Sequence, residues 1–223
     1  MIREPAQPIV LYHYFRSSSS WRVRWALIEK GIPFVPAAVD LLAGEQKQPA
    51  HLARNPLGMV PVLAIDGLLL TESVAILEYL EETRPSPALA PADPAGRALM
   101  RQLTQIIVAD TQPLQNLSVL QNIDALTGNS DSRKTWAERY IARGFDAYEA
   151  TLAQAVARGG TGPFSCGERL SLADLCLVPQ CYNARRQGMD ISRWPRIAAI
   201  EAACLATPSG QRSAPEAFRP SPA

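Results

Sequence analysis

Residues 15–31 read FRSSSSWRVRWALIEKG, and this stretch decides the fold because it joins an apolar run of β type to a helix. The apolar run, 9–15, leads into Arg16 and then into four serines, 17–20. The start of a helix presents unpaired backbone N–H groups and the positive end of the helix dipole. The serines therefore indicate either an ordinary N-cap with its loop or a place where an anion is held.

A second group of signals lies in residues 55–73, which read NPLGMVPVLAIDGLLLTES. Val60-Pro61 directly precedes an expected strand, where a proline without an N–H donor is tolerated and a cis bond acts as a turn device. Asp66-Gly67 separates two apolar runs, which strongly favours a β-hairpin. Glu72-Ser73 then opens the next helix.

The first 83 residues alternate short apolar runs with helical stretches. We expect a strand at 9–15, a helix that ends at Gly31, a strand at 34–39, the hairpin and a further helix. This order is a βαβ unit followed by ββα. Pro36 lies inside the second strand, so we expect that strand at the edge of the sheet, where a missing donor costs little.

A proline-rich linker over about 84–93 separates this domain, residues 1–86, from a second one, residues 93–223. The second domain reads as all-helical, with Asp93 as an N-cap and Pro94 at the first helical position. After about residue 208 the chain turns polar and proline-rich, and we expect a frayed tail.

Three patterns characterise the helical domain. A stripe with 4, 3, 4, 4 spacing predicts one buried face of a long helix; its members are Ile141, Phe145, Tyr148, Leu152 and Val156. Ser171 and Asp174 have the spacing of a capping box. Pro113 and Pro179 fall inside helical patterns and should kink or break them.

Composition excludes several classes of function. Lys and Arg total 22 against 21 Asp and Glu, a net charge of +1, which disfavours nucleic-acid and membrane partners. Residues 1–5 lack the apolar core of a signal peptide, and no apolar run reaches the length of a membrane span, so a cytoplasmic protein is expected. The four cysteines lack paired metal-ligand spacing and the chain has two histidines, so we expect no metal site and reduced, mostly buried thiols.

Four blocks of sequence resemble the zeta class of glutathione transferases, the maleylacetoacetate isomerases. They are SSSSWRVR at 17–24, EYLEETRP at 78–85, QPLQNLS at 112–118 and ADLCLVPQ at 173–180. The resemblance spans about residues 9 to 205. It implies an α/β plus all-α glutathione transferase fold, with an N-terminal thioredoxin-like domain and a C-terminal helical domain. The chain departs from the zeta motif at Ser19, where the family usually has cysteine.

The resemblance also implies a glutathione site. Ser17 matches the serine that donates to the thiol sulfur, Ser18 is the alternative, and Ser19 keeps a hydrogen-bonding group without a thiol. The γ-glutamyl part is expected at Glu72-Ser73, the cysteinyl unit at the Val60 backbone and the glycyl end near Gln46. The full set of implied glutathione-binding residues is Ser17, Ser18, Ser19, Ser20, Trp21, Arg22, Gln46, Val60, Glu72, Ser73, Gln112, Asn116, Leu117 and Ser118.

We expect arginine to bind the carboxylates of the substrate, because its planar fork matches a carboxylate. Arg16 and Arg22 flank the serines. Arg185 and Arg186 follow Asn183-Ala184, where the family also has arginine; a solvated surface charge is the alternative for each of the four. Ser118 matches the maleylacetoacetate type rather than the maleylpyruvate type. His13, inside a strand, is expected to be a core residue rather than an acid or base.

The implied activity is glutathione-dependent cis–trans isomerisation of maleylacetoacetate-type dicarboxylates, by addition of glutathione to the double bond, rotation and elimination. Two alternatives remain open: a transferase or dehalogenase that acts on small α-halo acids, and a non-catalytic protein that binds glutathione or a partner on the same scaffold. The resemblance further implies a homodimer and a role in aromatic amino acid catabolism.

Overall fold

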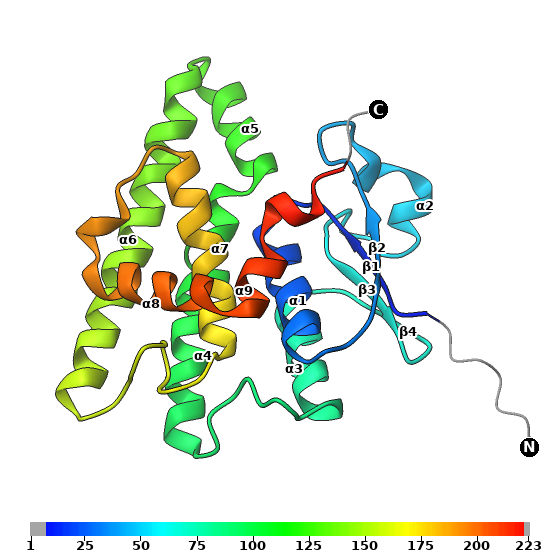
Figure 1. Cartoon of the computed structure of the whole chain (residues 1–223). Helices are drawn as coiled ribbons and strands as arrows, with labels where there is room; N and C mark the ends of the chain where they lie inside the picture. Colours follow the sequence, from blue (N-terminus) through cyan, green and yellow to red (C-terminus); the bar gives the residue numbers. More distant parts are fainter. Residues whose placement is uncertain (1–7, 221–223) are drawn as a thin grey trace, which may run out of the picture. The chain divides into compact units, whose positions relative to one another are not determined.

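The computed structural model describes residues 8–220, and contacts between Cα atoms divide the chain into two compact units (Figure 1). Unit 1 comprises the residues up to Ala88 together with those from Pro208 onward, and unit 2 comprises Leu89–Thr207. Residues 1–7 and 221–223 of the two expected domains lie outside the described residues. The segment from Pro208, expected as the end of the helical domain, belongs to unit 1.

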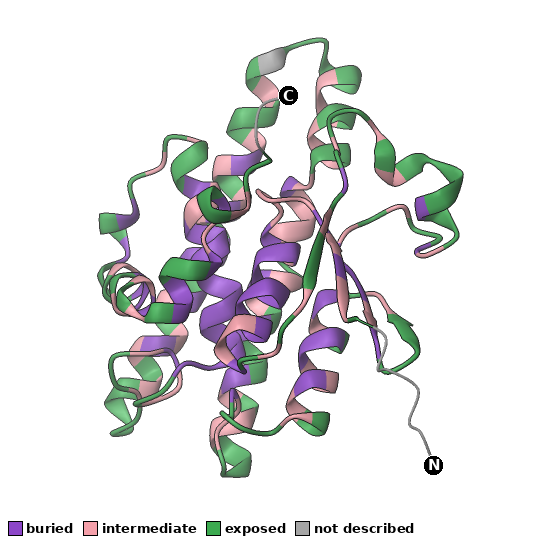
Figure 2. Cartoon of the chain, turned by 45° about the vertical axis from the view of Figure 1, so that its right-hand side comes forward, coloured by how far each residue is buried: buried purple, intermediate pink, exposed green. Residues whose placement is uncertain are grey.

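Unit 1 is built on a four-stranded sheet with the order β2-β1-β3-β4. The strands are β1 (Val10–His13), β2 (Val35–Ala38), β3 (Val62–Ile65) and β4 (Leu68–Leu70). β1 is parallel to β2 and antiparallel to β3, and β3 is antiparallel to β4, as the βαβ and ββα order predicts. β2, with Pro36, lies at the sheet edge and is mostly exposed, as its green and pink ribbon in Figure 2 shows.

The expected hairpin joins β3 to β4. Asp66 has φ 53° and Gly67 has φ 78°, and two central residues with positive φ are the mark of a tight hairpin turn of type I′. The Val60-Pro61 peptide bond is cis, as expected.

Helices α1 (Ser18–Glu29) and α3 (Ser73–Thr83) pack against each other in unit 1. Their apolar side chains form the core with those of the sheet; Leu11, Val23, Leu27, Ile76 and Leu80 are fully buried. Lys30 fixes the far ends of both helices, because its Nζ donates to Glu81 Oε2, the Arg84 carbonyl and the Pro87 carbonyl, each at 2.8 Å. Between β2 and β3 the chain forms two short turns of helix, η1 (Glu45–Lys47) and α2 (Pro49–Leu52).

Residues 208–218, which we call the C-terminal strap, also belong to unit 1. The strap contains α9 (Pro208–Ser213) and η4 (Pro215–Phe218), and α9 lies along α1 (Figure 1). Trp21 Nε1 donates to Ser213 Oγ at 2.9 Å, and Trp25 Nε1 donates to Ser209 Oγ at 3.0 Å. The expectation of a frayed tail is therefore wrong for the strap, because buried indole N–H groups require acceptors and the strap supplies them.

Unit 2 is helical. Its helices are α4 (Pro94–Val108), η2 (Gln112–Gln115), α5 (Leu117–Thr127), α6 (Ser130–Ala157), α7 (Leu172–Arg186), η3 (Ile191–Arg193) and α8 (Pro195–Ala206). Asp93 caps α4 as expected, since its Oδ1 accepts from the Gly96 N–H at 2.8 Å. Pro113 lies in the short η2 between α4 and α5, whereas α7 continues through Pro179.

The expected stripe on α6 is confirmed at four of its five positions. Ile141, Phe145 and Tyr148 are fully buried and Leu152 is 1% exposed, but Val156 is 47% exposed. The prediction fails at Val156 because this residue lies in the last turn of α6, where the helix ends at Ala157.

The capping box of α7 is confirmed. The Ser171 N–H and Oγ donate to Asp174 Oδ2 at 2.8 and 2.7 Å, and the Ser165 N–H donates to Asp174 Oδ1 at 2.8 Å. Burial raises the pKa of the Asp174 carboxyl. Most residues of α7 are buried, so α7 is the central helix of unit 2, and its ribbon is largely purple in Figure 2.

All four cysteines are free thiols, with Cys166 half-buried and the other three buried. In the stretch 8–220, no helix combines the length and apolar character that crossing a membrane requires. The same stretch contains no group of three or more His, Cys, Asp and Glu side chains arranged to hold a metal ion.

Candidate active site

Ser17 is the N-cap of α1. Its backbone is extended, with φ −67° and ψ 121°, and its Oγ accepts from the Ser20 N–H at 3.2 Å. This contact uses one lone pair of the hydroxyl and leaves the O–H hydrogen available as a donor. The first turn of α1 carries no acidic residue, so the positive end of its dipole keeps its full effect. Capping and donation to an anion are therefore compatible roles for Ser17.

The other three serines differ in exposure. Ser18 and Ser19 follow Ser17 in the first turn of α1. Ser18 is 6% exposed and Ser19 is half-buried. Ser20 is fully buried, and its Oγ accepts from the Tyr14 N–H at 3.4 Å. Trp21 is 3% exposed and its indole is bonded to the C-terminal strap. Ser20 and Trp21 thus belong to the first turn of α1 but are buried inside unit 1.

Arg22 joins α1 to the start of α3. Its side chain is 1% exposed, and Nη1 donates to Ser73 Oγ at 3.2 Å. Ser73 is the first residue of α3 and is itself 7% exposed. One buried guanidinium of α1 is therefore hydrogen-bonded to the first residue of α3.

Glu72 precedes α3 in an unusual conformation. It is exposed, with φ 61° and ψ 107°, and a positive φ is strained for a residue other than glycine. Strain of this kind is held by the surrounding structure and is enriched at ligand sites. The first turn of α3 carries no acidic residue, so its N–H groups present the positive end of the helix dipole beside Glu72, the N-cap residue.

The backbone before Pro61 is fixed by two side chains that the sequence patterns did not single out. His51 Nε2 and Asn55 Nδ2 both lie at hydrogen-bond distance from the Met59 carbonyl oxygen, at 2.9 and 3.0 Å. Asn55 stands in an Asn-Pro dipeptide, a turn signal that could have indicated a structural role. No local signal indicates His51.

Gln46 lies close to the same loop. It is half-buried in η1, and its backbone oxygen would be 3.0 Å from a Cβ atom at Gly58. The structure therefore brings the expected glycyl-end residue next to the loop that carries Val60.

Four of the expected residues belong to unit 2 and cluster at the start of α5. Gln112 Nε2 donates to Asn116 Oδ1 at 3.0 Å, and Asn116 is the N-cap of α5. Leu117 is 40% exposed and Ser118 is exposed in the first turn. This cluster presents a polar amide pair and an apolar side chain on the surface of unit 2.

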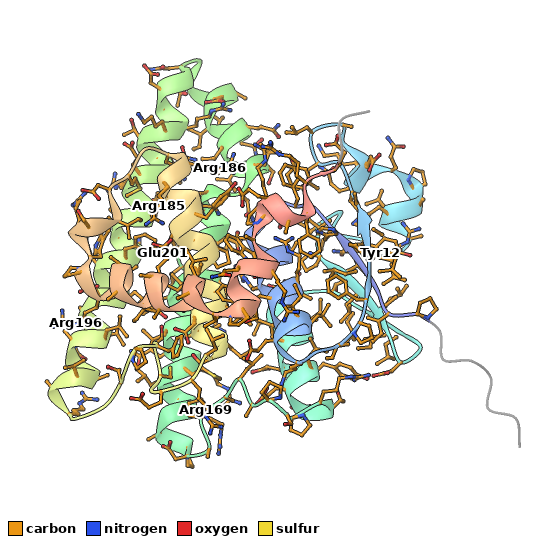
Figure 3. The ribbon with its side chains drawn as sticks, viewed as in Figure 1. Tyr12, Arg169, Arg185, Arg186, Arg196 and Glu201 are labelled. Carbon is orange, nitrogen blue, oxygen red and sulfur yellow. The ribbon has the colours of Figure 1, made fainter. Side chains whose placement is uncertain are left out.

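The candidate arginines have different surroundings. Arg16 Nη2 donates to the Tyr14 hydroxyl at 2.9 Å, and its guanidinium carbon lies 5.1 Å from the centre of the Phe15 ring. Arg185 and Arg186 end α7, and Figure 3 shows Glu201 beside Arg185. Arg185 and Arg186 are both exposed, but Arg185 forms an ion pair with Glu201, whose own side chain is 5% exposed. Arg185 is thus engaged in the fold, which leaves Arg186 as the better candidate for a substrate carboxylate.

His13 is a core residue, as expected. It is 3% exposed, its Nδ1 lies 3.3 Å from Arg24 Nη1, and its ring meets Phe218 of the strap edge-on. Burial, with a smaller contribution from the Arg24 charge, lowers the pKa of His13 to about 4. His13 is therefore neutral at physiological pH and accepts a hydrogen bond from Arg24.

Comparison with known proteins agrees with this arrangement. The model of the glutathione S-transferase N-terminal domain matches residues 7–82, and that of the C-terminal domain matches residues 135–202. A maleylacetoacetate isomerase of Rhizobium meliloti (strain 1021) is 44% identical over 216 residues, which cover 96% of this chain and 100% of that protein. This chain belongs to the glutathione S-transferase family.

Solved structures place this glutathione S-transferase near the zeta class. A holo structure of a bacterial maleyl pyruvate isomerase of the zeta class is similar at a TM-score of 0.89 and 40% identity, with 93% of this chain and 97% of that chain covered. The maleylacetoacetate isomerase of Anaeromyxobacter dehalogenans 2CP-1 with bound glutathione is similar at a TM-score of 0.83 and 46% identity, with 94% of this chain and 95% of that chain covered. Another structure of that isomerase holds dicarboxyethyl glutathione and citrate in its active site.

Proposed function

We propose that the protein is a glutathione-dependent cis–trans isomerase of maleylacetoacetate-type dicarboxylates. The observation that carries this proposal is the state of Ser17, which caps α1 through a lone pair and keeps its hydroxyl hydrogen for a further acceptor. A donor at the start of a helix whose first turn has no acidic residue stabilises an anion, and the anion that the glutathione thiol can form is a thiolate.

The residues of unit 1 fit the groups of glutathione. In our proposal, the Glu72 carboxylate receives the α-ammonium and the N–H groups at Ser73 receive the α-carboxylate, since α3 starts there without an acidic residue in its first turn. The Val60 backbone pairs with the cysteinyl unit and Gln46 lies at the glycyl end. Arg22 holds Ser73 in position through its buried hydrogen bond to the Ser73 hydroxyl.

The chemistry divides between the bound molecule and the protein. Glutathione supplies a thiolate that adds to the cis double bond and departs after rotation. Ser17 donates a hydrogen bond to the sulfur, with Ser18 as the alternative donor, and Ser19 keeps the first turn polar. Arg16 and Arg186 bind substrate carboxylates, and the cluster of Gln112, Asn116, Leu117 and Ser118 contributes the contacts of unit 2.

We also propose a homodimer that works in the cytoplasm, in aromatic amino acid catabolism. Leu68 and Leu69 of β4 are 46% and 53% exposed, and β4 is an edge strand. Exposed apolar side chains on a sheet edge are typical of a surface that another protein covers. Light scattering coupled to gel filtration tests the dimer, and a monomer at micromolar concentration would contradict it.

The proposed activity is tested with maleylacetoacetate and maleylpyruvate, each with and without glutathione. We expect conversion to the trans isomer only with glutathione, with total glutathione constant throughout and faster turnover of maleylacetoacetate. Consumption of glutathione with a small α-halo acid, without isomerisation, would instead support the dehalogenase alternative.

A further inference from the structure

Two buried side chains converge on one backbone carbonyl next to the candidate glutathione site. His51 and Asn55 are each 2% exposed, and both lie at hydrogen-bond distance from the Met59 oxygen. A carbonyl oxygen has two lone pairs and can only accept, so His51 donates from Nε2 and Asn55 donates from Nδ2. The hydrogen-bonding capacity of the Met59 carbonyl is therefore filled.

The state of the imidazole follows from this contact. With hydrogen on Nε2, the neutral ring carries its lone pair on Nδ1, and His51 Nδ1 is buried without a hydrogen-bond partner among residues 8–220. A nitrogen that carries no hydrogen leaves no buried donor unsatisfied. The Nε2–H donor of His51 is therefore committed to the Met59 carbonyl.

The carbonyl of Met59 and the N–H of Val60 belong to one peptide plane. The cis peptide bonds within residues 8–220 are Val60-Pro61 and Ser86-Pro87, so the bond between Met59 and Val60 is trans. In a trans peptide the carbonyl oxygen and the amide hydrogen point in opposite directions. Since His51 and Asn55 hold the oxygen on the buried side, the N–H of Val60 is directed to the other side.

Asn55 fixes this loop at a second point. Its Oδ1 accepts from the Leu57 N–H at 3.1 Å while its Nδ2 donates to Met59. One side chain thus closes the turn at Pro56-Leu57 and sets the carbonyl that follows it. His51 comes from α2, whose end is joined to Asn55 by a hydrogen bond from the Asn55 N–H to the His51 carbonyl at 2.9 Å, so two linked side chains hold the same peptide plane.

We propose that His51 and Asn55 are positioning residues that orient the Val60 N–H toward the cysteinyl unit of glutathione. The proposal rests on the proposed function, because it assumes that glutathione pairs with the Val60 backbone. Neither side chain touches the cosubstrate; each acts through the Met59–Val60 peptide. Their contribution is to binding, since the thiolate donor Ser17 lies on a different element.

The test is calorimetric titration of glutathione into the wild-type protein and three variants. His51→Phe keeps an aromatic ring and removes the donor, and Asn55→Asp keeps the acceptor for Leu57 but removes the donor to Met59. We expect each to raise the Kd for glutathione by about tenfold or more, as loss of an orienting hydrogen bond does. His51→Gln, whose amide can donate to the same carbonyl, should recover most of the affinity.

The matched control is His13→Phe, which makes the same exchange at another buried histidine of unit 1. We expect it to lower the melting temperature and leave the Kd unchanged. In the His51 and Asn55 variants, the thiol pKa of bound glutathione should remain that of the wild type, which separates positioning from thiolate stabilisation.

Wild-type affinity in both His51→Phe and Asn55→Asp would overturn the proposal. If Asn55→Asp does not fold, the Kd values of His51→Phe and His51→Gln decide whether the proposal stands. Failure of His51→Gln to recover the affinity for glutathione would also contradict a positioning role. A wild-type protein that binds no glutathione would refute the proposed function itself, which is a different result.

Discussion

The guanidinium of Arg22 and the hydroxyl of Ser73 are joined by a buried hydrogen bond of 3.2 Å between Nη1 and Oγ. The bond spans 51 positions of sequence and connects α1, which begins after Ser17, to α3, which begins at Ser73 itself. In the proposed function both helix starts bind glutathione, and this bond ties α1 to the first residue of α3 inside unit 1.

Arg22→Met, which keeps most of the side-chain volume but has no donor, should leave the Ser73 hydroxyl unpaired. We expect the free energy of unfolding to fall by about 2–3 kcal/mol and the Kd for glutathione to rise several-fold. Urea denaturation and calorimetric titration measure the two quantities. Lys30→Met, which removes another buried cation of unit 1, should lower stability without a change in affinity. Equal effects of both substitutions on the Kd would show that the link has no special role at the site.

Gly58→Ala tests the packing of the Val60 loop against η1. A Cβ at Gly58 would lie 3.0 Å from the Gln46 backbone oxygen, and Gly58 has φ +62°. We expect a loss of about 1–2 kcal/mol of stability together with weaker glutathione binding. Gly67→Ala is the control, because Gly67 has φ +78° with nothing within 4 Å of its Cβ position. It should cost stability through φ alone, so weaker binding in both variants would contradict the placement of Gln46 and Val60 in the site.

His13 should make the stability of the protein depend on pH between about 4 and 6.5. The pKa of His13 is lowered in the fold to about 4 from an ordinary value of 6.5, so in this window the unfolded chain binds the extra proton. Stability is therefore complete above pH 6.5 and falls as the pH falls toward 4, by about 3 kcal/mol for this group. Because carboxylates titrate over the same range, the measurement is the difference from His13→Gln, which keeps a neutral acceptor for Arg24. Parallel pH profiles for the two proteins would contradict a buried neutral His13.

Arg186→Ala should raise the KM for maleylacetoacetate by about tenfold or more, because a charge-assisted hydrogen bond to a carboxylate is lost. Conjugation of an uncharged electrophile should hardly change. Arg185→Ala provides the contrast: it leaves the nearly buried Glu201 without its cation and should lower stability rather than substrate affinity. Equal losses on charged and neutral substrates in Arg186→Ala would show that this residue supports the fold.

The features that sequence patterns predicted are those set by neighbouring residues. The Asp66-Gly67 hairpin, the Asp93 cap and the box at Ser171 each depend on residues within a few positions of one another, and each is confirmed. Edge placement of β2 followed from Pro36 alone, because proline cannot donate to a neighbouring strand.

What the patterns missed depends on distant partners. Trp21 bonds to Ser213, 192 positions away, and this contact changes the tail from an expected frayed end into part of unit 1. The hydrogen bond from His51 to the Met59 carbonyl joins residues only 8 positions apart. It forms because α2 packs against the loop, which no residue spacing signals. Val156 is exposed because the last turn of α6 extends past the core of unit 2, and no local spacing indicates where the core ends.

Ser17 is expected to carry two separable functions. Ser17→Ala removes both the cap of α1 and the thiolate donor, so we expect a loss of about 1 kcal/mol of stability and a fall in turnover of about 10²-fold or more. Ser17→Asp keeps an N-cap acceptor for the Ser20 N–H and, when ionised, has no donor, so it should restore the stability but not the turnover. Full turnover in Ser17→Asp, with loss in Ser18→Ala, would move the donor to Ser18.

The most direct measurement is the thiol pKa of protein-bound glutathione, followed by thiolate absorbance in the ultraviolet as the pH is raised. The account predicts that the wild-type protein lowers this pKa by about two pH units from about 8.5 in free thiols, and that Ser17→Asp, which has no donor when ionised, reverses most of the shift. Bound glutathione with an unshifted thiol pKa in the wild-type protein would contradict the account and favour a scaffold that binds glutathione without activating it.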